Sequence, residues 1–235
     1  YAGFAPATGQ RCTAPRMLAA EPGAEDVIRE LGRMCAEDDH HIGNPFTKGV
    51  KMGPLVDRGA RQKMEEAMTL ADELGAKVYG TLKANSNAIP MALNDNSFWV
   101  QPVMIDWSTA DVTDPKKAER LKALLGEEIF GPLLHVLPRV TGGIDGMIAV
   151  TEKYDTHGLA GSIFSSKDEE VDRYAANIRV TSLTVNEAPK DRSPNGPHGH
   201  PGLATIGVKG HFGLYASESV VARPKAKPQA PKPAA

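Results

Sequence analysis

Short apolar runs and helical repeats of apolar residues alternate along most of the chain. The runs, which suit buried strands, occupy residues 16–20, 77–79, 100–105, 133–137, 159–164 and 181–185. Between them the apolar positions follow helical spacing, at residues 24–35, 60–74, 116–125, 144–154 and 169–178. Strands that alternate with helices need crossover connections, which give a mostly parallel sheet covered on both faces. The pattern therefore predicts an α/β fold with helices on both faces of a mostly parallel sheet.

Two segments interrupt this alternation. Residues 83–97 are rich in asparagine and small side chains, which predicts a surface loop or an insertion. Residues 190–213 are rich in glycine, proline and histidine and offer few residues for a core. Loops of this length in a compact domain are usually functional or disordered. At residues 224–235 only proline, lysine, alanine and one glutamine remain, so we expect an extended, disordered tail.

The composition is that of an ordinary soluble globular protein. The 235 residues are 41% hydrophobic and 24% charged, and they suffice for one substantial domain with or without an appendage. A net charge of -2 gives no electrostatic reason to expect nucleic acid or an anionic membrane surface. No apolar run approaches the roughly 20 residues needed to cross a bilayer. We therefore expect no nucleic acid and no membrane among the partners.

The cysteine count and the first residue bear on the cellular setting. Two cysteines cannot form a disulfide framework, which favours a reducing compartment. We expect a cytoplasmic location, with the mitochondrial matrix as the alternative. The chain starts at Tyr1 rather than at methionine, which indicates processing or a fragment of a longer protein.

The two cysteines lie in different contexts. Cys12 lies in a glycine-containing loop directly before the first strand, where the backbone can approach a substrate and the thiol can meet a carbonyl carbon. Cys35 lies on the apolar face of a predicted helix, where a cysteine acts as a small buried hydrophobic residue. Most free cysteines are packing residues, so the local pattern makes Cys12 a candidate nucleophile and no more.

A series of motifs resembles the aldehyde dehydrogenase superfamily. Gly9-Gln10-Arg11-Cys12, together with Arg16, is similar to the nucleophile segment of that family, and Glu127-Glu128-Ile129-Phe130-Gly131-Pro132 matches a family signature. Further motifs occur in the family's order: Met52-Gly53-Pro54-Leu55-Val56-Asp57, Gly75-Ala76-Lys77-Val78, Phe98-Trp99-Val100-Gln101-Pro102, His157-Gly158-Leu159-Ala160-Gly161 and Val185-Asn186. The resemblance covers residues 1–223.

The resemblance implies a covalent mechanism with a nicotinamide cofactor, NAD or NADP. The thiolate of Cys12 would attack an aldehyde to give a thiohemiacetal, whose collapse expels hydride and leaves a thioester that water hydrolyses. The backbone N–H of Cys12 would be one donor to the oxyanion. Glu128 would accept hydrogen bonds from the nicotinamide ribose, and Phe130 would pack beside the nicotinamide. Without the resemblance, the two glutamates would be interpreted as a solvated loop pair.

The sequence also departs from the family pattern. The nucleotide-binding half that precedes the cysteine in the family is missing, together with the general-base glutamate and the oxyanion-hole asparagine that it carries. Residues 194–202 stand where the family has Pro-Phe-Gly-Gly, which alters the expected aldehyde pocket. The histidines of this region suggest a metal site, but no cysteine or clear carboxylate accompanies them, so we expect none. They are His198, His200 and His211.

These observations predict a catalytic domain at residues 1–213, as the catalytic half of a larger NAD(P)-dependent aldehyde dehydrogenase. The alternative is a catalytically inactive relative that serves as a structural subunit of a larger assembly, and a third possibility is thioesterase activity. Residues 214–223 are expected to form a C-terminal oligomerisation arm. The β-prone run from Tyr215 to Arg223 would pair as a strand with another copy, a partner chain or a missing part of the same polypeptide, or else with its own sheet.

Overall fold

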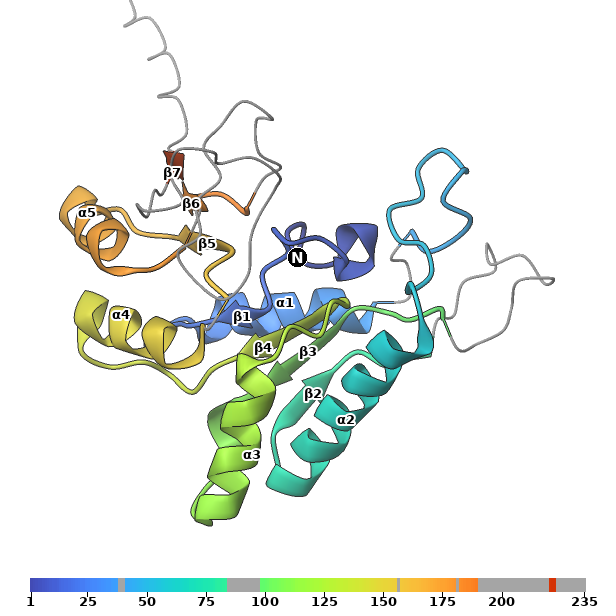
Figure 1. Ribbon diagram of the computed structural model, residues 1–235, viewed down its shortest axis with the longest axis horizontal. Coiled ribbons are helices and arrows are strands. Elements are labelled where there is room, and N and C mark those ends of the chain that lie inside the picture. Colours follow the sequence, from blue (N-terminus) through green and yellow to red (C-terminus); the bar gives the residue numbers. More distant parts are fainter. Residues whose placement is uncertain (38–40, 84–97, 156, 181, 190–219, 223–235) are drawn as a thin grey trace, which may run out of the picture.

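The computed structural model describes residues 1–37, 41–83, 98–155, 157–180, 182–189 and 220–222 (Figure 1). The strands form a four-stranded sheet in the order β1-β4-β3-β2 and a three-stranded sheet in the order β5-β6-β7. Their bounds are β1 Met17–Leu18, β2 Lys77–Tyr79, β3 Val103–Asp106, β4 Leu133–Val136, β5 Ala160–Ile163, β6 Ser182–Val185 and β7 Val220–Ala222. The helices are η1 Pro6–Gly9, α1 Glu25–Ala36, α2 Arg58–Leu74, η3 Trp107–Thr109, α3 Pro115–Gly126, α4 Gly143–Tyr154 and α5 Asp168–Asn177.

The α/β prediction is confirmed. Four of the five strand pairs are parallel, and the exception is the antiparallel pair of β2 and β3. All five predicted helices lie within two residues of their expected bounds. The helix predicted from the repeat at 60–74 begins as expected after Asp57, whose side chain accepts from the backbone N–H of Ala60 at 2.9 Å, and ends at Gly75 in the left-handed conformation.

Side chains of the four-stranded sheet alternate between two cores, because successive residues of a strand point to opposite faces. On one face, Val103 and Ile105 of β3 join the core beneath α2 and α3. On the other face, Met104 joins Ile28 and Cys35 of α1. Figure 1 shows α2 and α3 together in front of the sheet and α1 behind it. The predicted cover on both faces is therefore present.

Two strands differ in extent from the apolar runs that predicted them. The run at 100–105 yields a strand only from Val103, because Pro102 has no N–H to give to a ladder. β1 is assigned to two residues, but its pairing with β4 reaches further. The carbonyl oxygens of Arg16, Leu18 and Ala20 accept from the N–H groups of His135, Leu137 and Val140, each at 2.9 Å. The predicted run at 16–20 thus lies beside β4 and the residues that follow it, as far as Val140.

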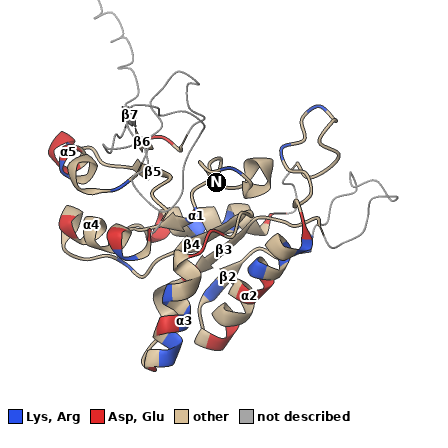
Figure 2. Ribbon diagram, viewed as in Figure 1, with Lys and Arg blue, Asp and Glu red and all other residues tan. Residues whose placement is uncertain are grey.

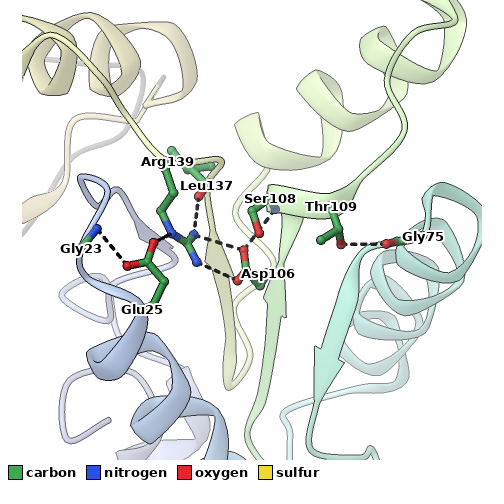
Figure 3. A network of polar contacts seen from close by, with 8 residues as sticks. All are labelled: Gly23, Glu25, Gly75, Asp106, Ser108, Thr109, Leu137 and Arg139. Carbon is green, nitrogen blue, oxygen red and sulfur yellow. Dashed lines mark hydrogen bonds and ion pairs between the residues drawn. The ribbon is translucent and has the colours of Figure 1, made fainter.

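Three side chains close the carboxyl ends of β3 and β4 (Figure 3). Arg139 donates to both carboxylate oxygens of Asp106, at 3.3 and 3.1 Å, and to Glu25 at the start of α1, at 3.4 Å. Burial alone would raise the pKa of Asp106, but the hydrogen bonds from Arg139 and Ser108 outweigh it and the pKa is lowered. We call Asp106, Arg139 and Glu25 the carboxyl-edge clamp. It joins α1 to the sheet.

Charged residues of both signs are interspersed along α2 and α3 rather than gathered by sign (Figure 2). Arg120 of α3 pairs with Glu73 of α2 at 2.7 Å, and Arg61 pairs with Glu65 at 2.8 Å. Exposed pairs of this kind contribute little to stability. Their mixed signs give these two helices no single-sign surface.

β7 is the only described part of the predicted arm. Its three residues pair in parallel with β6 of the same chain. For residues 220–222, pairing with the chain's own sheet is therefore what the structure shows, and an oligomerisation role for residues 214–223 stays a prediction. Residues 84–97, the histidine-bearing segment 190–213 and the tail 224–235 lie outside the described residues.

Candidate active site

The two cysteines occupy the contrasting environments that the sequence predicted. Cys35 is fully buried on α1, and desolvation by burial raises the pKa of its thiol to about 12. Its thiol therefore stays protonated and unreactive. Cys12 is exposed, in the turn between η1 and β1. Of the two, only Cys12 can meet a substrate in the folded chain.

The loop that carries Cys12 is bonded to the segment from Gly53 to Val56. Thr8 Oγ1 donates to the carbonyl oxygen of Gly53 at 2.9 Å. The amide of Gln10 accepts from the N–H of Val56 at 2.7 Å and donates to the carbonyl oxygen of Pro54 at 3.1 Å. The family resemblance assigned no role to the motif at 52–57. These bonds show that it supports the loop that carries Cys12.

The same loop packs against the segment from Glu127 to Pro132, backbone on backbone. Gly9 has a φ of +66°, and a Cβ on it would overlap the carbonyl group of Gly131. Ala7 and Thr8 also have positive φ values, 55° and 57°, which residues with a side chain seldom adopt. Strained backbone of this kind persists where the surroundings hold it and is frequent at functional sites.

Some side chains of the segment from Glu127 to Pro132 point into the core and others toward the surface. Ile129 is buried in the core beneath α2 and α3, whereas Phe130, with a φ of 56°, keeps 41% of its surface exposed. Glu127 forms an ion pair with Lys63 of α2. Among the residues that the structure describes, the half-buried carboxylate of Glu128 has no partner. One glutamate of the pair is therefore held by α2 and the other is available to a ligand.

A cavity of about 780 Å³ brings the predicted site residues together, since Cys12, Glu128 and Phe130 all line it. Its volume lies within the range of about 300–1,000 Å³ that is usual for small-molecule sites. The cavity continues along β1 and β5 between the two sheets. The three residues that the sequence named thus share one cavity, although they come from segments far apart in the chain.

Arg16 links the Cys12 loop to the end of α3, which leads into the segment from Glu127 to Pro132. Its guanidinium donates to the carbonyl oxygen of Leu125 at the end of α3, and to Asp155 beyond α4 at 3.0 Å. The residues after Leu125 lead directly into Glu127 and Glu128. In the sequence Arg16 stands out only as part of a motif, and the structure adds its contacts. The contacts of Gln10, which belongs to the same motif, and the roles of Thr8 and Lys63 were missed, because nothing in their local sequence indicates a distant partner.

The site lies at the amino ends of the parallel strands. Cys12 precedes β1, and Glu128 and Phe130 precede β4. Ligands of open α/β sheets usually bind at the carboxyl ends, but here that edge carries the clamp of Asp106, Arg139 and Glu25. The arrangement therefore differs from a mononucleotide site of the usual open-sheet type.

The fold and this pair of loops define the class of protein. The model of the aldehyde dehydrogenase family matches residues 1–217, and the chain belongs to that family. Among the described residues, no group of three or more His, Cys, Asp or Glu side chains could hold a metal ion. The described helices include none that is long and apolar enough to span a membrane. The three histidines between 198 and 211 lie outside the described residues.

Individual relatives are similar over most of this chain but are much longer. The bifunctional protein PutA of Klebsiella aerogenes is 25% identical over 228 residues, which are 92% of this chain and 15% of that protein. Human mitochondrial succinate-semialdehyde dehydrogenase is 27% identical over 180 residues, 77% of this chain and 30% of that one. The chain therefore spans less than a third of the length of either.

Solved structures confirm the fold. An apo mutant of betaine aldehyde dehydrogenase from Staphylococcus aureus superposes with a TM-score of 0.66 at 19% identity, covering 88% of this chain and 37% of that one. An aldehyde dehydrogenase of Mycobacterium tuberculosis complexed with NAD⁺ gives 0.63 at 24% identity, covering 85% and 37%. At these identities the likeness establishes the fold alone.

Proposed function

We propose that this chain is the catalytic half of an NAD(P)-dependent aldehyde dehydrogenase and that Cys12 is its nucleophile. The observation that carries the proposal is the packing of Gly9 on Gly131, which brings the cysteine loop and the loop of Glu128 and Phe130 to one cavity. Family membership supports aldehyde oxidation in general. One structural neighbour contains both NAD⁺ and a chemically modified cysteine.

The residues present fit the nicotinamide end of a dinucleotide. The carboxylate of Glu128, which has no partner among the described residues, can accept from two ribose hydroxyls, and the exposed ring of Phe130 offers an apolar surface beside it. The described residues contain no G-x-G-x-x-G turn that would hold the pyrophosphate. The remainder of the cofactor site would therefore come from elsewhere in the polypeptide or from another chain.

The chain's own residues would act in sequence. The thiolate of Cys12 adds to the aldehyde carbon, and the oxygen becomes an oxyanion that the backbone N–H of Cys12 can stabilise. The bound nicotinamide supplies the acceptor for the hydride released when the oxyanion collapses. The C–H bond breaks, the carbon is oxidised to a thioester, and water then releases the carboxylic acid and restores the thiol. Glu128 and Phe130 would hold the nicotinamide that accepts this hydride.

The first test compares the thiols directly. Cys12 should react with iodoacetamide in the folded chain much faster than Cys35, as measured by peptide mass spectrometry, because only Cys12 is exposed. In the polypeptide that carries this chain, Cys12→Ala should abolish aldehyde-dependent reduction of NAD or NADP. Glu128→Gln should slow hydride transfer while covalent capture of the aldehyde persists.

The outcomes separate the proposal from its rival. Turnover that survives Cys12→Ala overturns the assignment of the nucleophile. A polypeptide that reduces neither nucleotide with any of a panel of aldehydes would instead support the inactive structural subunit. We also propose that the protein is cytoplasmic. The mitochondrial matrix is the alternative, because one relative is a mitochondrial enzyme.

A further inference from the structure

Gln10, two residues before Cys12, contacts the backbone of a distant segment through both ends of its side-chain amide. Its Oε1 accepts from the N–H of Val56 at 2.7 Å, and its Nε2 donates to the carbonyl oxygen of Pro54 at 3.1 Å. The two backbone groups flank Leu55 on the same segment. A single side-chain amide therefore satisfies one donor and one acceptor, as the peptide group of a neighbouring strand would do.

The segment that Gln10 contacts is itself fixed to the core. Leu55 is 2% exposed and packs in the cluster beneath α2 and α3. The N–H of Leu55 donates to the carbonyl oxygen of Phe98 at 2.7 Å, ahead of β3. The amide of Gln10 thus reaches a rigid support. On its other side, the cysteine loop is limited by the contact between Gly9 and Gly131.

We propose that Gln10 is a positioning residue that sets the placement of Cys12 relative to the loop of Glu128 and Phe130. The inference rests on the proposed function, since placement matters only if Cys12 reacts with a bound substrate. Only glutamine has both the reach and the paired donor and acceptor that Pro54 and Val56 require. Glutamate has no donor for the carbonyl of Pro54, and asparagine is one methylene shorter. A misplacement of about 1 Å can cost on the order of a hundredfold in rate.

The test isolates the two hydrogen bonds. Gln10→Met keeps an unbranched side chain of similar length and removes both bonds, and Gln62→Met on the exposed face of α2 is the matched control. Activated-ester acylation of Cys12 is followed with p-nitrophenyl acetate as a pre-steady-state burst. The burst amplitude reports the fraction of folded, competent chain, while the first-order rate constant at saturating ester reports placement. Iodoacetamide serves as the second reagent, because it reacts without a bound orientation.

We expect Gln10→Met to lower the saturating acylation rate constant about tenfold to a hundredfold. The burst amplitude, the half-saturating ester concentration and the iodoacetamide rate should stay within about threefold of the parent chain. Gln62→Met should leave all four quantities unchanged. An unaltered acylation rate constant overturns the proposal. A parallel fall in the iodoacetamide rate also overturns it, because Gln10 would then act on the thiol itself.

Hydrogen exchange at Val56 distinguishes failure of this inference from failure of the proposed function. The N–H of Val56 should exchange faster in Gln10→Met, since its acceptor is Oε1 of Gln10. Unchanged exchange would refute the positioning contact whatever the chemistry. If the polypeptide that carries this chain shows no burst that depends on Cys12, the proposed function fails, and Val56 exchange still decides whether Gln10 holds the loop.

Discussion

His135 should make the stability of the chain depend on pH between neutrality and mild acid. It is 1% exposed in the middle of β4, and burial, with the nearby charge of Arg16, lowers its pKa to about 3. Trp107 Nε1 donates to its Nδ1 at 3.1 Å, which places the proton of the neutral ring on Nε2. No described group accepts a hydrogen bond from Nε2. Both causes of the shift, burial and the charge of Arg16, disfavour a positive charge on the ring.

The direction and size of the effect follow from the two pKa values. In the unfolded chain histidine has a pKa of about 6.5, so below that value the unfolded state binds a proton that the folded state refuses. The stability that depends on the neutral ring is complete above the unfolded pKa and is lost as the pH falls from there toward the folded value. Over about 1.5 pH units, at about 1.4 kcal/mol for each, the loss is about 2 kcal/mol at pH ~5.

Urea unfolding of the parent chain and of His135→Gln, near pH 7.5 and near pH 5, measures this loss. Glutamine does not titrate, and its carbonyl oxygen can still accept from Trp107. The parent should lose about 2 kcal/mol more than the variant between the two conditions, read from midpoints at equal slope. Equal losses in the two proteins would refute the reasoning, because His135 would then take up its proton equally in both states.

Two other substitutions test contacts described above. Gly9→Ala should lower the free energy of unfolding by about 1–3 kcal/mol in urea titrations and disturb the reactivity of Cys12, because the new methyl group overlaps Gly131. Gly126→Ala, with open space around its position, is the control, and an equal effect of both would contradict the packing. Asp106→Asn should cost about 1–3 kcal/mol at neutral pH through Arg139. Below pH ~4 the free energy of unfolding should fall less steeply in Asp106→Asn than in the parent chain, because the lowered pKa of Asp106 in the folded chain contributes its full stability only above the pKa of the unfolded chain. If both proteins lose stability equally as the pH falls, the pKa of Asp106 does not differ between the folded and unfolded states.

The sequence predicted the fold more fully than the site. The apolar periods located all five helices and the buried strands, because burial imposes a repeat that local sequence carries. They did not reveal that His135 would be enclosed, since one polar residue in an apolar run can face either way. Cys12, Glu128 and Phe130 were identified through the family resemblance, not through local physics. The structure places all three at one cavity, and their roles stay a proposal.

What sequence reasoning missed is the set of contacts that hold the site. Gln10 and Val56 meet across 46 residues, and no local pattern indicates such a pair. The positive φ values of Thr8 and Phe130 are equally hidden, because neither residue type favours that conformation. Tertiary packing imposes them. Glycine at position 9 was the one visible signal, and it was interpreted as room for a substrate rather than for a second backbone segment.

The contact of Gly9 with Gly131 also bears on when the site forms during folding. The two residues lie on either side of α1, α2 and α3 in the sequence, so a large loop must close before they touch. Contacts of high sequence separation form slowly and add little until the intervening elements are in place. During synthesis the cysteine loop would leave the ribosome long before its neighbour exists. Cys12 is exposed in the folded chain as well, so what the late contact adds is not protection of the thiol but its placement beside Glu128 and Phe130.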